Sequence, residues 1–276
     1  MNDMVGIIGY GNMGMAIGER LKTDYDLIVF DKDKEKLKIA KGVTIAKNLA
    51  ELLSKSDALI LAVKPQDFAP VLKEMKAGAE DKLVISIAAG ISTGNIEKAL
   101  GEVRLIRAMP NMGAKIGESV TCICKGRFAD DSDLEFADEL FGRIGCTRNI
   151  DETMMDAATA ISGSGPGYIF DYMDKEKIDP KNIPEHTRFT LRMRLEKAAE
   201  AIGFNREDAV FLASNTANAC MIVVAKVGIS AAELRSQVAS KGGTTEAGLA
   251  VINKGGTWEE AAQAALKRAK ELSKGN

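Results

Sequence analysis

Three glycines near the start of the chain have the spacing of a phosphate-binding turn. Gly9, Gly11 and Gly14 form a G-x-G-x-x-G pattern between an apolar run at 4–8 and a segment of helical character at 15–21. A strand, a glycine turn and a helix in this order are typical of dinucleotide binding. Gly9 would allow a tight turn, Gly11 the approach of a pyrophosphate, and Gly14 close packing of helix on sheet. The pyrophosphate would bind N–H groups at the positive end of the helix dipole.

An acidic residue lies where such a site places the adenosine ribose. The apolar segment 26–30 ends in Asp31, about 20 residues after Gly11, the spacing expected of a carboxylate that binds ribose hydroxyls. This carboxylate favours NADH because it repels a 2′-phosphate, whereas Lys32 and Lys34 would attract that phosphate. The sequence therefore predicts NADH or NADPH as the cofactor, with Asp31 favouring NADH. A sheet with a tight glycine turn and no ligand is the alternative.

A second glycine turn lies in the last quarter of the chain. It reads Ser240-Lys241-Gly242-Gly243-Thr244-Thr245 and precedes a helical segment that starts at Glu246. Consecutive N–H groups at a helix start, flanked by hydroxyls, suit a carboxylate or a phosphate. An ordinary N-cap by serine or threonine explains the same pattern, and the residues alone leave both interpretations open.

Residue counts argue against several other kinds of chemistry. The single histidine, His186, and four cysteines without a C-x-x-C pair predict no metal site. We expect buried thiols in a reducing compartment and a solvent-exposed loop histidine. A net charge of −2 gives no reason to expect nucleic acid or an anionic membrane as a partner. No apolar run reaches transmembrane length and no signal-peptide pattern is present, so we expect a cytoplasmic protein.

Strands and helices alternate through the first half of the chain. Strands are predicted at 4–8, 26–30, 43–46, 58–63 and 83–87, with short connections. Further strands are predicted at 103–108 and 119–124, followed by a helix at 131–141 and a segment, 147–150, that leads out of the sheet. This order predicts an α/β fold with an N-terminal Rossmann-type doubly wound sheet, whose ligands bind outside the carboxyl ends of the strands.

The remaining chain is almost wholly helical, so we predict domains at 1–152 and 153–276. The helices are expected at 152–161, 187–202, 205–227, 246–252 and 258–272. The glycine-rich segment 162–167 would end the first helix, and Pro166 would begin a new one with its first turns at 168–173. Two prolines indicate a loop at 174–185. Small and apolar residues cover much of helix 205–227, which indicates a subunit interface. The second domain is thus predicted to be an all-helical dimerisation domain.

Five stretches, in order, resemble the pyrroline-5-carboxylate reductase family and span nearly the whole chain. They are I-I-G-Y-G-N-M-G at 7–14, A-V-K-P-Q at 62–66, R-A-M-P-N at 107–111, S-G-S-G-P at 162–166 and S-K-G-G-T-T-E-A-G-L at 240–249. The resemblance implies proline biosynthesis: reduction of 1-pyrroline-5-carboxylate to L-proline, with hydride transfer from the nicotinamide to the carbon of the cyclic imine. It also implies a small-molecule substrate and a homodimer through the helical domain, which can assemble further.

The resemblance implies roles for the matching positions. The pyrophosphate would contact Ile8, Gly9, Tyr10, Gly11, Asn12, Met13 and Gly14. Other cofactor-binding candidates, beside Asp31 and Lys32, are Asn48, Ala62, Val63, Lys64 and Pro65 toward the ribose groups, and Ser86, Ile87 and Ala88 toward the nicotinamide. Thr245 would be the catalytic side chain that hydrogen-bonds the imine nitrogen. The substrate carboxylate would bind in a pocket shaped by Ser240, Gly242, Gly243 and Thr244.

The chain departs from the family pattern at four places. Lys241 stands where the family usually has proline, and Met112-Gly113 stands where it usually has Thr-Pro. Gly228 lies near the position at which some members carry a glutamate. Segment 168–203 is longer than the family's single uninterrupted helix. These departures leave two alternatives: a reductase of a related cyclic imine or other β-hydroxyacid-dehydrogenase-like substrate, and a non-catalytic nucleotide-binding paralogue. The turn at 240–245, intact except at Lys241, favours an enzyme.

Overall fold

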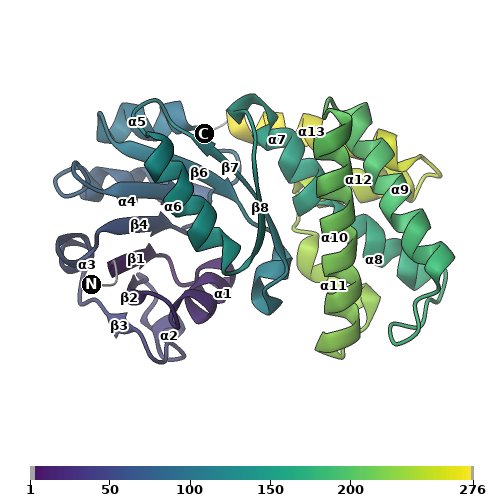
Figure 1. The fold of residues 1–276 in the computed structure, drawn as a ribbon, viewed down its shortest axis with the longest axis horizontal. Helices are drawn as coiled ribbons and strands as arrows, with labels where there is room; N and C mark the ends of the chain where they lie inside the picture. Colours follow the sequence, from purple (N-terminus) through teal and green to yellow (C-terminus); the bar gives the residue numbers. More distant parts are fainter. Residues whose placement is uncertain (1–3, 275–276) are drawn as a thin grey trace. The chain divides into compact units, whose positions relative to one another are not determined.

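The computed structural model describes residues 4–274 and divides into two units (Figure 1). The first comprises residues 4–108 and Cys122–Glu152; the second comprises Met109–Thr121 and the residues from Thr153 onward. The prediction of domains 1–152 and 153–276 assigns 109–121 to the first domain, whereas its contacts lie in the second unit. There the Asn111 side chain donates a 3.1 Å hydrogen bond to the carbonyl oxygen of Ser162. The two-domain organisation itself stays a prediction.

An eight-stranded sheet forms the strand-rich half of the chain. Its elements are β1 (Met4–Ile8), α1 (Asn12–Leu21), β2 (Asp26–Phe30), α2 (Lys34–Leu37), β3 (Thr44–Ile45), α3 (Leu49–Lys55), β4 (Ala58–Leu61), α4 (Phe68–Met75), β5 (Leu83–Ser86), α5 (Thr93–Leu100), β6 (Arg104–Met109), β7 (Ser119–Lys125), α6 (Asp131–Gly142) and β8 (Gly145–Asn149). The strand order is β3-β2-β1-β4-β5-β6-β7-β8, and neighbouring strands from β3 to β6 are parallel. The predicted doubly wound α/β class is confirmed. The segment 147–150, expected to leave the sheet, instead overlaps β8 because residues 145–149 add an eighth strand at its edge.

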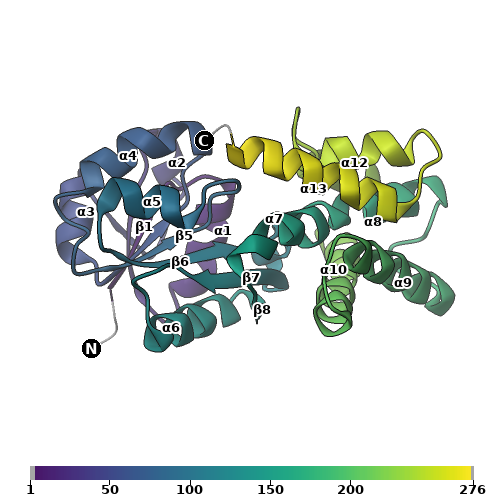
Figure 2. The same ribbon diagram turned by 90° about the horizontal axis from the view of Figure 1, so that it is seen from above.

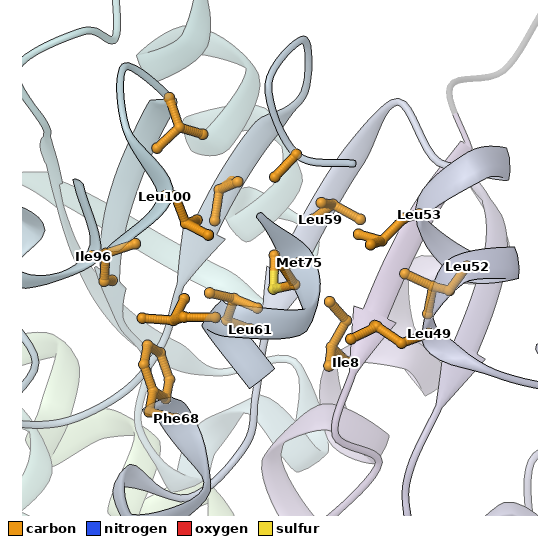
Figure 3. Packing of buried hydrophobic residues seen from close by; sticks show 14 of the residues in the cluster. Ile8, Leu49, Leu52, Leu53, Leu59, Leu61, Phe68, Met75, Ile96 and Leu100 are labelled. Carbon is orange, nitrogen blue, oxygen red and sulfur yellow. The ribbon is translucent and has the colours of Figure 1, made fainter. Parts of the chain in front are cut away.

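Apolar side chains on both faces explain why the central strands are continuous apolar runs. Ile8 belongs to a cluster in which Leu52 of α3, Met75 of α4 and Ile96 of α5 are fully buried (Figure 3). Figure 2 shows these three helices on one face of the sheet and α6 on the opposite face. Ile7, the preceding residue, faces α1 instead, since a Cβ at Gly18 of that helix would lie 3.4 Å from Ile7 Cδ1. Successive side chains of β1 therefore pack into two apolar layers, one on each face of the sheet, as expected for a parallel sheet.

The second unit is built of helices. Their bounds are α7 (Met155–Ala158), a π-helical turn η4 (Thr159–Gly163), α8 (Gly165–Lys175), α9 (Glu185–Ala201), α10 (Arg206–Val227), α11 (Ala231–Val238), α12 (Thr244–Ile252) and α13 (Trp258–Lys274). The glycine-rich segment 162–167 does not end a helix, contrary to the prediction. The Ser164 N–H reaches the Thr159 carbonyl oxygen, five residues earlier, at 2.9 Å, so the chain continues helically into α8.

Two further differences concern α9 and α11. His186 is exposed, as expected, but it lies in the first turn of α9 rather than in a loop. Helix α11 was not expected. Its start carries a capping box, in which the Ser230 hydroxyl accepts from the Glu233 N–H and the Glu233 carboxylate accepts from the Ser230 N–H. The Arg235 side chain then links α11 to α8 through a 2.8 Å ion pair with Asp171, which is buried.

Helix α10 has the length and composition of a membrane-spanning helix. Its most apolar window has a mean hydropathy of 1.5, and 50% of that window is buried within the protein. The expectation that no segment reaches transmembrane length is therefore wrong here, because scattered Ser, Asn and Thr residues interrupt the apolar run without making it polar overall. The core helix of a soluble protein passes the same test, so one such helix is weak evidence for a span.

Candidate cofactor and substrate sites

A pocket of about 340 Å³ lies at the carboxyl ends of β1, β2 and β4. Strand β1 pairs with β2 on one side and β4 on the other, so the strand order reverses here, and ligands of open α/β sheets bind at such a switch point. The pocket is lined by Ile8, Gly9, Gly11, Phe30, Asp31, Lys32, Lys36, Ala62, Val63, Lys64, Gln66, Asp67 and Val71. It thus brings together candidates from three predicted strand ends.

The three glycines of the turn differ in what requires them. Gly9 has a φ of +97°, and a Cβ there would lie 2.8 Å from the backbone of Ala62. A Cβ at Gly14 would lie 2.1 Å from the Gly9 carbonyl oxygen. A Cβ at Gly11, by contrast, would meet no protein atom within 4 Å, and Gly11 caps α1 without a side-chain hydrogen bond. Open space over exposed helix-start N–H groups fits a pyrophosphate, which needs close approach at this glycine.

Several predicted cofactor residues lie outside the pocket lining. Asn12, Met13 and Gly14 form the first turn of α1, next to Gly11. The Tyr10 side chain is buried beneath that helix, where a Cβ at Gly18 would lie 3.0 Å from its ring. The Tyr10 side chain is therefore turned away from the pocket, and Tyr10 could contact a ligand only through its backbone.

The other candidates follow β3, β4 and β5. Asn48 caps α3, its side-chain oxygen accepting from the Glu51 N–H at 2.9 Å. Pro65 begins a short 3₁₀ helix. Ser86 is buried at the end of β5, and Ala88 belongs to the apolar core, which leaves Ile87, half-buried between them. Asn48, Ser86, Ile87 and Ala88 are not among the described residues that line the pocket around β1 and β2.

Asp31 is the most constrained polar side chain of the pocket. Its carboxylate accepts from the Tyr10 N–H and from the Asp33 N–H, each at 2.8 Å, and Lys36 Nζ lies 3.2 Å from it. Lys32, the neighbouring candidate, pairs with Asp67 at 2.5 Å. Lys36 and Asp67 were not among the predicted residues, nor were Phe30, Gln66 and Val71; of these, Gln66 belongs to the A-V-K-P-Q stretch and could have been inferred from it.

The second glycine turn is held from two sides. Gly242 has a φ of +71°, its N–H donates to the Glu246 carboxylate at 2.6 Å, and its carbonyl oxygen accepts from Arg268 Nε at 2.8 Å. A Cβ at Gly243 would lie 2.4 Å from the Ser240 hydroxyl, so the turn needs glycine there. Gly243 caps α12 without a side-chain hydrogen bond. The N–H groups of the first turn of α12 are therefore not capped by a side chain.

Thr245 lies where α12 crosses α8. It is buried, its hydroxyl lies 3.3 Å from the Ser164 hydroxyl, and Ser164 lies 2.9 Å from the hydroxyl of Thr244. A Cβ at Gly167 would lie 2.4 Å from the Thr245 methyl group, so this glycine permits the approach. The two motif stretches S-G-S-G-P and S-K-G-G-T-T-E-A-G-L thus meet in three dimensions, with three hydroxyls at their contact.

Tyr168 extends this contact into the core of the second unit. Its hydroxyl lies so near α12 that a Cβ at Gly248 would be 2.1 Å away. Burial raises the pKa of the Tyr168 phenol well above its ordinary value, and a hydrogen bond with Ser164 offsets part of that increase. The phenol is therefore protonated at neutral pH. Ser164, Gly167, Tyr168, Glu246 and Arg268 were not predicted as site residues.

The departures from the family pattern have local explanations. Gly228 adopts a φ of +71° and ends α10 in the left-handed conformation that glycine favours. A Cβ at Gly113 would lie 2.2 Å from the Glu118 carbonyl oxygen. Lys241 is exposed within the turn. Within residues 4–274, no group of three or more His, Cys, Asp or Glu side chains is arranged to hold a metal ion.

Comparison with known proteins agrees with this geometry. A family model for NADP oxidoreductases, described as coenzyme F420-dependent, matches residues 4–90, and one for pyrroline-5-carboxylate reductase dimerisation matches residues 188–272. The pyrroline-5-carboxylate reductase of Methanosarcina acetivorans is 32% identical, over 99% of each chain. The chain belongs to the pyrroline-5-carboxylate reductase family. The resemblance inferred from the five motif stretches is thereby confirmed.

Solved structures of this family share the fold. The pyrroline-5-carboxylate reductase of Coxiella burnetii aligns with a TM-score of 0.65 and 30% identity, over 99% of each chain. The enzyme of Plasmodium falciparum, solved with NADP bound, aligns with a TM-score of 0.64 and 26% identity, over 99% of this chain and 98% of the other. The matched dimerisation model indicates oligomerisation through the helical unit.

Proposed function

We propose that this protein reduces 1-pyrroline-5-carboxylate to L-proline with NADH or NADPH. The observation that carries the proposal is the turn at 240–245, in which a buried Thr245 hydroxyl adjoins the uncapped start of α12 in a member of the reductase family. The substrate offers a carboxylate for helix-start N–H groups and a ring nitrogen for a hydroxyl. An anion site and a hydroxyl, side by side, match both groups.

The reaction converts a C=N bond into a C–N single bond. When bound, the nicotinamide would supply a hydride, with its two electrons, to the imine carbon and would itself be oxidised. The ring nitrogen takes one proton, from solvent or already present on a protonated imine. Thr245 would hydrogen-bond that nitrogen, while N–H groups of the turn, shaped by Ser240, Gly242, Gly243 and Thr244, would hold the carboxylate. The protein therefore orients the substrate and needs no strong general acid.

The cofactor would be held by the first unit. Supporting this are the pocket at the β1–β4 switch point and the open space above Gly11. Direct contacts are proposed for the predicted residues that line it, namely Ile8, Gly9, Gly11, Asp31, Lys32, Ala62, Val63 and Lys64. Backbone contacts are proposed for Tyr10, Asn12, Met13 and Gly14, which continue the turn into α1. Asn48, Pro65, Ser86, Ile87 and Ala88 remain proposals from the resemblance.

We further propose a homodimer formed through the helical domain, with assembly into larger oligomers open to it. The half-buried apolar window of α10 and the matched dimerisation model over 188–272 support this partner. A cytoplasmic location, expected from the sequence, is also proposed. A net charge of −2 supports neither nucleic acid nor an anionic membrane as a further partner.

The test mixes purified protein with 1-pyrroline-5-carboxylate and follows NADH and NADPH oxidation in parallel with proline formation. We expect proline to form in step with cofactor oxidation. Thr245→Ala should lower kcat/KM by about 10- to 100-fold, while Thr245→Ser, which keeps the hydroxyl, should retain most activity. Cofactor binding without proline formation would contradict the proposal, and full activity of Thr245→Ala would remove the role assigned to this residue.

A further inference from the structure

The cofactor pocket contains a lysine whose position has a consequence for cofactor choice. Lys36 Nζ lies 3.2 Å from Asp31 Oδ2 and 3.3 Å from Asp31 Oδ1. The Asp31 side chain is only 6% exposed, whereas that of Lys36 is 41% exposed. Both residues line the pocket. The buried Asp31 carboxylate thus lies at the pocket, and the half-exposed Lys36 ammonium group is paired with it.

The acceptor capacity of Asp31 is fully used in this arrangement. A carboxylate offers about four acceptor positions. The Tyr10 N–H occupies one on Oδ2, the Asp33 N–H occupies one on Oδ1, and Lys36 takes one on each oxygen. The two backbone donors belong to the fold itself, one in the β1–α1 turn and one just before α2. Lys36 sits on a flexible stem, so its contacts are the ones a ligand can replace.

We infer that Lys36 occupies the ribose-binding positions of Asp31 until the cofactor displaces it, and that this exchange selects NADH. This inference rests on the proposed NAD(P)H-dependent function. The vicinal hydroxyls of an unmodified ribose supply two donors for the two positions that Lys36 leaves. A 2′-phosphate supplies no such donor on that oxygen and places negative charge beside a carboxylate that two backbone N–H groups prevent from turning away.

The other lysine beside Asp31 does not reverse this selection. Lys32 Nζ lies 2.5 Å from the Asp67 carboxylate, so its charge is already paired at the pocket wall. Lys36 could hold a 2′-phosphate only while it also neutralises Asp31, and the two anions would then compete for one ammonium group. The Plasmodium falciparum relative was solved with NADP. In this chain the pair Asp31–Lys36 favours NADH, which has no 2′-phosphate.

Calorimetric titration of the purified protein with NADH and with NADPH, without substrate, tests the inference independently of turnover. The wild type should bind NADH about tenfold or more tightly than NADPH. Lys36→Met should raise this ratio several-fold, because it frees Asp31 for the ribose and removes the ammonium group that is paired with its carboxylate. Lys36→Arg should weaken NADH binding, because a bidentate guanidinium is harder to displace from a carboxylate.

Lys38→Met is the matched control. Lys38 lies two residues further along, pairs with Glu35 at 2.7 Å and lies outside the pocket lining, yet its substitution changes net charge equally. It should leave the ratio unchanged. Tighter binding of NADPH than of NADH, with that preference lost in Lys36→Met, would overturn the inference, as would equal ratios in the two methionine variants. Selective NADH binding without proline formation would overturn the proposed function and leave this inference standing.

Discussion

The Thr245 hydroxyl lies 3.3 Å from the hydroxyl of Ser164, and both side chains are buried. Their residues are far apart in the chain and meet because α8 and α12 cross at this point. Ser164 also contacts Thr244 and Tyr168, so it is the central member of a hydroxyl cluster. A residue that touches Thr245 in this way can fix the direction of its hydroxyl without touching substrate.

Ser164→Ala should therefore show whether Ser164 orients the Thr245 hydroxyl or only stabilises the fold. We expect kcat/KM to fall several-fold, with a stability loss of about 1–3 kcal/mol from the unpaired hydroxyls left behind. Ser162→Ala is the control, because Ser162 is equally buried but its hydroxyl contacts the Ala158 carbonyl oxygen, 2.9 Å away, rather than Thr245. Steady-state kinetics and chemical denaturation measure the two effects. Equal kinetic losses in both variants would show that Ser164 acts through stability alone.

Gly167→Ala should damage the site by steric conflict, and the damage should be reversible. The added Cβ would lie 2.4 Å from the Thr245 methyl group, which demands separation of α8 and α12 at a cost of about 1–3 kcal/mol. Thr245→Ser removes that methyl group and keeps the hydroxyl. The double variant should regain much of the stability and activity lost in Gly167→Ala. A double-mutant cycle with no coupling energy would refute this contact as the cause.

Arg268→Met should loosen the substrate turn. Arg268 Nε donates to the Gly242 carbonyl oxygen at 2.8 Å, and its loss leaves Gly242 held through its N–H group, which donates to Glu246. We expect KM for the substrate to rise about fivefold, with a smaller change in kcat, because a mobile turn binds a carboxylate less well. Lys267→Met, one residue earlier and exposed, should leave KM unchanged. A fall in kcat at constant KM would contradict this assignment.

Alkaline pH should destabilise the protein partly through Cys124. Burial, with a smaller contribution from the charge of Glu152, raises the pKa of this thiol from 9.0 to about 12. Well below pH 9 the thiol is protonated in both states, so its contribution is constant. Above that pH the unfolded chain loses the proton and the folded chain keeps it, so stability should fall by about 1.4 kcal/mol per pH unit until the folded thiol ionises. Denaturation series should show a shallower decline in Cys124→Ala; an identical decline would assign the effect to other groups.

The sequence predicted the sheet well because its signals are local. The apolar runs that form β4 and β5 are buried along their whole length, and each is followed by a turn. Asn205 marks the start of α10 by an ordinary cap, its side chain accepting from the Asp208 N–H. These elements needed no knowledge of distant residues.

Features that depend on distant contacts were missed or misplaced. Gly165 was expected in a turn that ends a helix, yet it begins α8. Its lack of a side chain is required by packing, since a Cβ there would lie 2.8 Å from Leu195 of α9. The burial of the Tyr10 side chain under α1 could not be inferred from the glycine pattern, while the contact predicted between Tyr10 and the cofactor stays a prediction. Lys36 reaches the pocket from α2 through its pairing with Asp31, which no spacing rule specifies. Helix α11 could have been predicted from the Ser230–Glu233 capping box.

The π-helical turn at Thr159–Gly163 sets the rotation of α8 about its own axis. A helix advances by about 100° per residue, and a π turn accommodates one residue more than an α turn in the same rise. Removing a single residue from this turn would allow a regular helix, but it would rotate α8 by that angle about its axis. Ser164, Gly167 and Tyr168 would then point away from α12. The meeting of the two motifs is therefore set by a one-residue count, which makes the length of this segment as constrained as its composition.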